Sequence, residues 1–147
     1  MKSITLSVLF ALCTASFAYA QDETMIALYG QQKQWEKAKD EVEKQLSNPK
    51  LKDRDKPMLL LWRIEVYAEI YADNALYAKY PEAEQQAISA MNDYLKYDPT
   101  MKMMKDENFV YSVNNVYQQS LSYGNDGWKA EDWAKAFKYY STGLQVV

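Results

Sequence analysis

The sequence predicts an all-helical protein. Its 147 residues include only four glycines and four prolines, and helix-forming residues dominate between them. The alternating apolar and polar pattern of half-buried strands is missing. Apolar residues instead recur at spacings of three and four, which places them on one face of an α-helix. The segments with this spacing are 22–32, 34–47, 57–72, 82–97, 107–122 and 129–145.

The first twenty residues resemble a cleavable signal peptide. Lys2 is followed by an almost wholly apolar run, residues 4–17, and then by Ala18-Tyr19-Ala20, the small-x-small form that signal peptidase cuts. The apolar run is too short to remain as a membrane-spanning helix. We therefore predict cleavage after Ala20, a domain over residues 21–147, location in the periplasm or outside the cell, and no stable membrane insertion.

The chain lacks the residues that most enzymes and metal sites use. It has no histidine, and its one cysteine, Cys13, lies in the predicted signal peptide. Leu12 precedes Cys13 where a lipid-attachment motif usually has a small residue, which argues against a lipid anchor. Without His and Cys the mature chain has no Ser-His-Asp triad, no Cys-His nucleophile and no ordinary zinc or haem site. No motif selects a pair of carboxylates for glycoside hydrolysis, so we predict neither catalysis nor a cofactor.

The charge pattern argues against binding to nucleic acid. The net charge is −3, and acidic and basic residues alternate in stretches such as KDEVEKQ and KLKDRDK. A nucleic-acid-binding protein needs a basic stripe that replaces the counterions of the phosphates. The alternation is typical of solvated helix faces.

Proline and acidic residues mark the expected helix boundaries. Asn48-Pro49 and Asp98-Pro99 should each close a helix, because the residue before proline is disfavoured in the α region. Asp55 precedes Pro57 by two residues, which predicts a cap and a proline in the first turn of the next helix. Residues 48–56 then form a charged loop.

Three segments repeat one pattern. QWEKAKDEVEKQL at 34–46 and DWAKAFKYYSTGL at 132–144 align without a gap, each with Trp, then Ala, an apolar residue and Leu. EQQAISAMNDYLKYDP at 84–99 retains all of these but the Trp. The alanines of the three segments, Ala38, Ala87 and Ala136, are separated by two equal intervals of 49 residues.

This pattern resembles helix B of the tetratricopeptide repeat, a helix–turn–helix unit of about 34 residues. The resemblance implies antiparallel helix pairs stacked as a short right-handed α-solenoid of about three repeats. An insertion around residues 73–81, and a third helix A that starts near Asp106, account for the longer interval. The whole is similar to secreted tetratricopeptide proteins of Gram-negative bacteria.

In this family a small residue of helix A, twelve positions before the alanine, lies at the closest helix contact. Counting back from Ala136 reaches Gly124, so Gly124 is expected as a packing residue inside a helix and not in a turn. Gly127 is the weak point of this helix, where a kink or break is the alternative. A calcium loop is the alternative. Asn125 and Asp126, with the acidic residues at 131–132, do not supply its alternating ligands and distal Glu.

The other two repeats fit the register less evenly. Counting back from Ala38 gives Ile26, which is larger than the position prefers. In the second repeat the insertion leaves two registers, one with Ala68 at the contact and one with Glu65. The first is favoured, because the second would place a charge at the tight contact.

The hydrophobic core is expected to contain one face of each helix. Tyrosine at helical spacing is more often part of a core than of a sugar-stacking platform. The predicted core residues are Leu60, Ile64, Tyr67, Tyr71, Ala87, Met91, Leu95, Val113, Tyr117, Phe137 and Tyr140.

The resemblance also implies a binding surface, because tetratricopeptide proteins bind peptides or partner helices along the concave face lined by their A helices. The matching positions here are Trp62, Glu69, Gln118, Leu121, Asn125 and Trp128. Trp62 and Trp128 could instead pack against neighbouring helices. No Lys or Arg occupies the positions of the family's basic clamp for a C-terminal carboxylate. Lys129 is the nearest basic residue.

We therefore expect a periplasmic adaptor that binds a peptide or partner protein without catalysis. The alternative is a glycan-binding component of an outer-membrane uptake system. The last helix reaches residues 144–147 without a polar cap, although the end of a solenoid normally needs one. We expect this face either to continue into a longer array or to mediate self-association.

Overall fold

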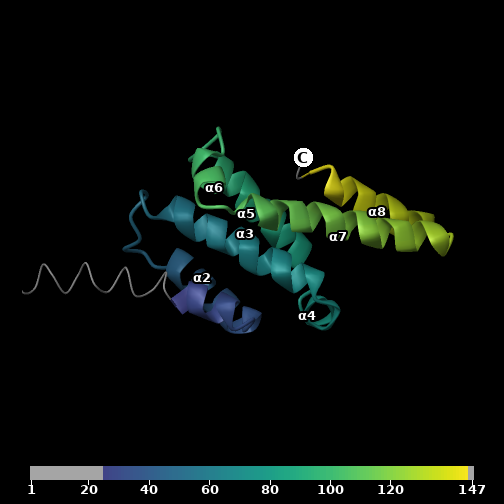
Figure 1. Ribbon diagram of the computed structural model, residues 1–147, viewed down its shortest axis with the longest axis horizontal. Coiled ribbons are helices and arrows are strands. Elements are labelled where there is room, and N and C mark those ends of the chain that lie inside the picture. Colours follow the sequence, from purple (N-terminus) through teal and green to yellow (C-terminus); the bar gives the residue numbers. More distant parts are fainter. Residues whose placement is uncertain (1–24, 146–147) are drawn as a thin grey trace, which may run out of the picture.

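The computed structural model describes residues 25–145, and every regular element in that range is an α-helix (Figure 1). The helices pack antiparallel, which confirms the all-α prediction. They comprise residues 25–31, α2 (Trp35–Leu46), α3 (Lys56–Ala72), α4 (Asn74–Lys79), α5 (Ala83–Leu95), α6 (Lys102–Asp106), α7 (Val110–Lys129) and α8 (Trp133–Gly143). The predicted signal peptide and Cys13 lie outside the described residues.

The six predicted helices are all present, and two short ones were not predicted. The insertion at 73–81 contains α4, which begins because the Asp73 carboxylate accepts hydrogen bonds from the backbone N–H groups of Ala75 and Leu76 (2.9 and 3.0 Å). Residues 102–106 form α6. The periodic segment ended at residue 122, whereas α7 continues to Lys129, so Gly124 lies inside the helix as the count from Ala136 predicted.

The Asp98-Pro99 stop is built around the Asp98 carboxylate. It accepts hydrogen bonds from the Tyr94 hydroxyl at 2.6 Å, the Thr100 hydroxyl at 2.7 Å and the Met103 N–H at 2.8 Å. These bonds, the Tyr94 hydroxyl first among them, lower the pKa of Asp98 to about 2. The turn thus ties the end of α5 to the start of α6.

The first turn of α3 is only partly as predicted. Pro57 lies in that turn and Asp55 occupies the N-cap position. The Asp55 side chain does not cap the helix, because its carboxylate accepts from the Arg54 guanidinium at 3.2 Å instead.

Helix α3 lies at the centre of the molecule and packs against α2, α5, α7 and α4 (Figure 1). Ten of its 17 residues are buried, on nearly every side of the helix. Its partners contribute smaller residues to the same core, including Ala38 and Val42 of α2 and Ala87 of α5. Burial of this apolar surface is the main stabilising contribution to the fold.

Helices α7 and α8 form an antiparallel hairpin that extends away from this centre (Figure 1). Their seam is lined by small residues. A Cβ on Gly127 would lie 2.7 Å from the backbone nitrogen of Ala136, and one on Gly124 would lie 2.6 Å from the Tyr140 ring. Both glycines therefore allow close helix contact. Ala136 therefore contacts Gly127, whereas the twelve-residue count from the repeat had placed Gly124 opposite Ala136.

A polar and aromatic joint connects the hairpin to the centre. The Tyr71 and Ser120 hydroxyls lie 3.1 Å apart, linking α3 to α7. Glu84 of α5, only 1% exposed, accepts a hydrogen bond from the Tyr77 hydroxyl at 3.1 Å and pairs with Lys138 of α8 at 3.0 Å. Burial, before any other cause, raises the pKa of Tyr71 and Tyr77.

The predicted core is correct except at α8. Leu60, Ile64, Tyr67, Tyr71, Ala87 and Met91 are buried, while Leu95, Val113, Tyr117 and Tyr140 are half-buried. Phe137 is 76% exposed, so its assignment to the core was wrong. The physical reason is that Phe137 lies on the outer side of α8, away from the seam with α7 and from the contact of Lys138 with Glu84.

Candidate functional site

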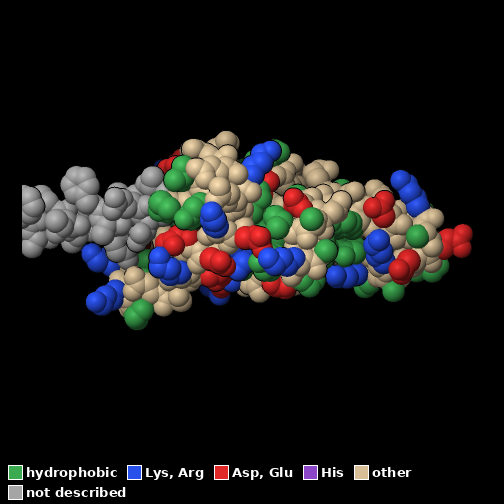
Figure 2. Space-filling model, turned by 90° about the horizontal axis from the view of Figure 1, so that it is seen from below, with side chains coloured by type: hydrophobic (Ala, Val, Ile, Leu, Met, Phe, Trp, Pro, Cys, Tyr) green, Lys and Arg blue, Asp and Glu red, His purple; other side chains and the backbone are tan. Residues whose placement is uncertain are grey.

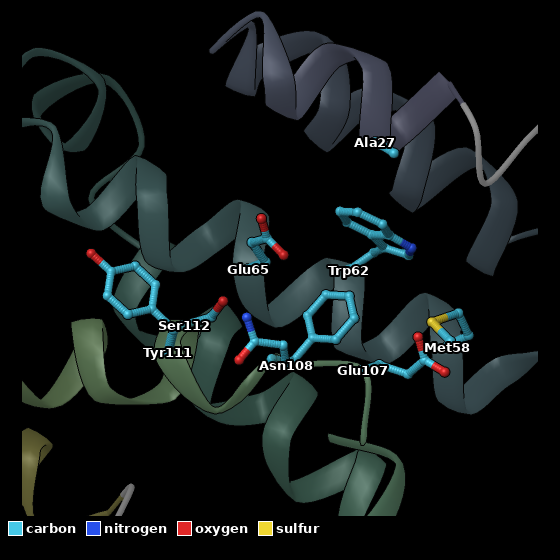
Figure 3. A pocket seen from close by; sticks show the side chains of 9 residues that line it. Ala27, Met58, Trp62, Glu65, Glu107, Asn108, Tyr111 and Ser112 are labelled. Atoms are coloured by element: carbon cyan, nitrogen blue, oxygen red, sulfur yellow. The ribbon is translucent and has the colours of Figure 1, made fainter. Parts of the chain in front are cut away.

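A pocket of about 600 Å³ lies where three helical segments meet. Residues 25–31 contribute Ala27, α3 contributes Met58, Trp62 and Glu65, and the segment from the end of α6 into α7 contributes the rest. Figure 3 shows Trp62 and Glu65 projecting from α3, with Ala27 on one side and Asn108 and Tyr111 on the other. The complete lining is Ala27, Met58, Trp62, Glu65, Glu107, Asn108, Phe109, Tyr111 and Ser112.

Helical spacing on α3 explains why three of its side chains share the pocket. Met58, Trp62 and Glu65 follow one another at intervals of four and three residues, so they lie along one face. The neighbouring residues Leu61 and Ile64 are buried on other faces of the same helix. The pocket side is therefore a side of α3 that is left partly open.

Trp62 has both a packing role and an exposed surface. Its ring meets Phe109 edge to face, with centroids 5.1 Å apart and planes at 89°. Trp62 is nevertheless only half-buried and lines the pocket. The contact with Phe109 restricts the indole, which lowers the side-chain entropy that Trp62 would lose on binding a ligand.

Glu65 is a partly desolvated carboxylate without a partner. Among residues 25–145 no side chain or backbone group donates a hydrogen bond to it or pairs with it. Burial, and secondly the charge of Glu69 one turn away, raises the pKa of Glu65. Such a carboxylate gains more from a bound cation than a solvated one would.

The cations of α3 do not neutralise this site. Lys56 pairs with Asp53 at 2.8 Å, and Arg63 pairs with Glu43 of α2 at 2.7 Å. No Lys or Arg is present among the described residues that line the pocket, whereas Glu65 and Glu107 both are. The pocket thus combines aromatic walls with negative charge that no basic residue in its described lining compensates.

Of the six residues predicted to bind a partner, only Trp62 lines the pocket. Glu69 lies one turn beyond Glu65, is half-buried, and accepts a hydrogen bond from the Asn115 amide at 3.2 Å. Gln118 is exposed and Leu121 half-buried farther along α7. The structure therefore brings Trp62 and Glu69 to one side of α3.

The remaining two predicted residues turn toward α8. Asn125 accepts a hydrogen bond from the Tyr140 hydroxyl at 2.7 Å, and Trp128 packs edge to face on Trp133 with centroids 5.1 Å apart. Trp128 is still 59% exposed. Asn125 and Trp128 thus belong to the hairpin and do not line the pocket.

The sequence reasoning missed the pocket residues after α6. Asn108 adopts a left-handed backbone conformation with φ 63°, which asparagine tolerates better than most residues, and it turns the chain into α7. This turn depends on α6, which carried no clear periodic signal. Glu65 could have been found, because it lies one turn after Trp62 on the same helix face.

A second exposed feature is the outer stripe of α8, defined here as Trp133, Phe137 and Leu144. These residues are 57%, 76% and 72% exposed. On the face of the molecule seen in Figure 2, Lys and Arg side chains lie beside Asp and Glu, with neither sign gathered in a large patch.

No group of three or more Asp, Glu, His or Cys in the described part of the chain is arranged to hold a metal ion. None of the described helices has the length and apolar character needed to cross a membrane. Comparison of the chain with protein-family models, curated proteins and solved structures found no match.

Proposed function

We propose that this protein binds a peptide, or an extended segment of a partner protein, in the pocket between residues 25–31, α3 and the start of α7. The observation that carries the proposal is the lining of this pocket by three separate helical segments around a rigid Trp62. Its volume of about 600 Å³ suits a ligand of a few residues. An aromatic anchor in a partly desolvated pocket is typical of binding hot spots.

The proposed architecture is a tetratricopeptide-like array of three helix pairs: residues 25–31 with α2, α3 with α5, and α7 with α8. Burial of the repeated alanines supports it, because Ala38, Ala87 and Ala136 are 0%, 2% and 3% exposed. Ala68 is also buried while Glu65 lines the pocket, which favours the first register of the second repeat. In this arrangement the pocket lies among the first helices of the pairs.

The residue composition favours binding over catalysis. The chain has no histidine, and its only cysteine lies in the predicted signal peptide. The proposed location is the periplasm or outside the cell, on the strength of the sequence at residues 1–20. Binding of nucleic acid is not proposed, since acidic and basic side chains alternate.

Selection from a random peptide library against the purified protein tests the proposal. Affinities of the selected peptides are then measured by fluorescence polarisation. Ala27→Trp should fill the pocket and abolish binding. Ala134→Trp, the same exchange at an exposed site on α8, is the matched control and should bind as the wild type does.

Failure to select any peptide would contradict the proposal. Full binding by a folded Ala27→Trp variant would contradict the assignment to this pocket. Circular dichroism of both variants shows whether each has retained its helices.

Glycan binding is the second candidate, and the exposed indoles of Trp128 and Trp133 favour it. Exposed aromatic rings can stack on sugars, and these two are 59% and 57% exposed. Affinity electrophoresis through polysaccharide gels tests this candidate. Retardation that is lost in Trp128→Ala and kept in Ala27→Trp would support it over peptide binding.

A further inference from the structure

We infer that the pocket receives a basic side chain, Arg or Lys, of the bound peptide, with Glu65 as its counter-ion. This inference rests on the proposed function and specifies the ligand of the same site. The charges are thus the reverse of those in a basic clamp: here the protein supplies the carboxylate and the peptide supplies the cation.

The charges around the pocket support a cation. Glu65 and Glu107 both line it, Glu69 lies one turn beyond Glu65, and no basic residue of the described chain is in the lining. An acidic peptide side chain or a C-terminal carboxylate would enter against these like charges. A cation would instead pair with Glu65, the carboxylate of the lining that is partly buried and has no partner among the described residues.

The local side chains also suit a cation in shape and chemistry. The Trp62 ring, held by Phe109 at 5.1 Å, offers an aromatic surface for a cation–π contact. The Asn108 side chain adds an amide oxygen that can accept a hydrogen bond. A guanidinium could thus donate to Glu65 and stack on Trp62 at the same time, so Arg is favoured over Lys.

The selected peptides test the inference directly. They should share an Arg or Lys, and replacing that residue with Gln should weaken binding to the wild type about tenfold or more, since a hydrogen bond between charged groups is lost. Glu65→Gln should weaken the unchanged peptide to a similar extent. The two changes together should cost little more than either alone, because both remove the same interaction.

Glu82→Gln is the matched control. Glu82 is exposed at the start of α5, outside the pocket lining, and its substitution removes the same charge. Affinity should stay within about twofold of the wild type, because a distant exposed charge contributes little.

The outcomes separate the inference from the proposed function. Peptides that bind in an Ala27→Trp-sensitive manner but lack a shared basic residue, or that bind Glu65→Gln at full strength, would overturn the inference and leave the proposed function intact. A library that gives no binder at all would overturn both.

Discussion

Helices α3 and α8 show how differently two parts of one helical chain are held. Ten of the 17 residues of α3 are buried, and its main partners are the four helices α2, α4, α5 and α7. Only three of the 11 residues of α8 are buried: Ala136, Thr142 and Gly143. Helix α3 is therefore stabilised by the burial of apolar surface. Helix α8 depends on one close seam with α7 and on a few polar contacts.

The difference follows from where each helix lies. Because α3 is central, apolar side chains on nearly all its faces meet partners, including Leu61 and Val66 at 0% exposed. Because α8 is peripheral, Phe137 is left outside while the seam is built of small residues. Local opening should accordingly begin at α8 and involve α3 last.

The largest expected effect is at the centre. Leu61→Ala should lower the free energy of unfolding by about 2–5 kcal/mol, since it removes a fully buried side chain and leaves a cavity. Leu144→Ala, at a 72% exposed site, is the control and should change it by less than about 0.5 kcal/mol. Urea denaturation followed by circular dichroism measures both. Equal losses would contradict the contrast between the two regions.

The next effect is at the seam. Gly127→Ala places a Cβ 2.7 Å from the backbone of α8, so the helices must separate. The overpacking cost of about 1–3 kcal/mol exceeds the gain of about 1 kcal/mol from removing a helical glycine, which predicts a net loss of up to about 2 kcal/mol. Hydrogen exchange should show the loss of protection mainly in α8.

Gly143→Ala is the matched exchange on α8 itself. A Cβ there would have its nearest neighbour at 3.5 Å, an ordinary contact. The variant should be as stable as the wild type or slightly more so, because alanine restricts the unfolded chain. A loss equal to that of Gly127→Ala would show that the seam is not the cause.

A smaller effect of opposite sign is expected on the partly open pocket side of α3. Glu65→Gln should raise stability at pH 7, because it removes a carboxylate whose charge is disfavoured first by burial and secondly by Glu69 at i, i+4. The like-charge pair alone accounts for about 0.2–0.5 kcal/mol. The pKa of Glu65 is higher in the folded protein than its ordinary value of 4.5, so stability is lost as the pH rises through that range. The gain should therefore vanish below about pH 4.

Thermal denaturation at pH 7 and at pH 3.5 tests this prediction. Stabilisation together with weaker peptide binding would mark Glu65 as a functional residue kept at some cost to the fold. A loss of stability at pH 7 would instead indicate that Glu65 has a stabilising role in the folded protein.

The smallest effect is expected at the outer stripe of α8. Phe137→Ser should change the free energy of unfolding by less than about 0.5 kcal/mol, because the ring is 76% exposed. Phe109→Ser, at a 6% exposed site beside Trp62, is the contrasting control and should be severely destabilising. Chemical denaturation of the two variants gives the comparison.

Phe137→Ser also tests the expectation that α8 is covered by a second copy of the chain or by further helices. If a second copy covers it, light scattering will show a mass that falls on dilution, and Phe137→Ser will abolish the association. A mass that stays at one chain at high concentration would contradict self-association.

Sequence alone determined the six main helices and many of their buried residues. Spacings of three and four located all six main helices, and the equal intervals between Ala38, Ala87 and Ala136 identified residues that are all buried. Gly124 was correctly expected inside a helix, and the helix also continues through Gly127, since the local tendency of Gly-Asn-Asp-Gly to turn yields to close packing against α8.

Only the tertiary structure decided which apolar faces found partners and which stayed open. Periodicity gives a helix an apolar side, but it does not say whether another helix covers it, and so Phe137 was misassigned. The pocket likewise depends on residues 25–31, α3 and the turn at Asn108, which are distant in sequence. Glu65 has no partner among the described residues, since Lys56 and Arg63 of α3 pair with other carboxylates, and that is a property of the packed helices.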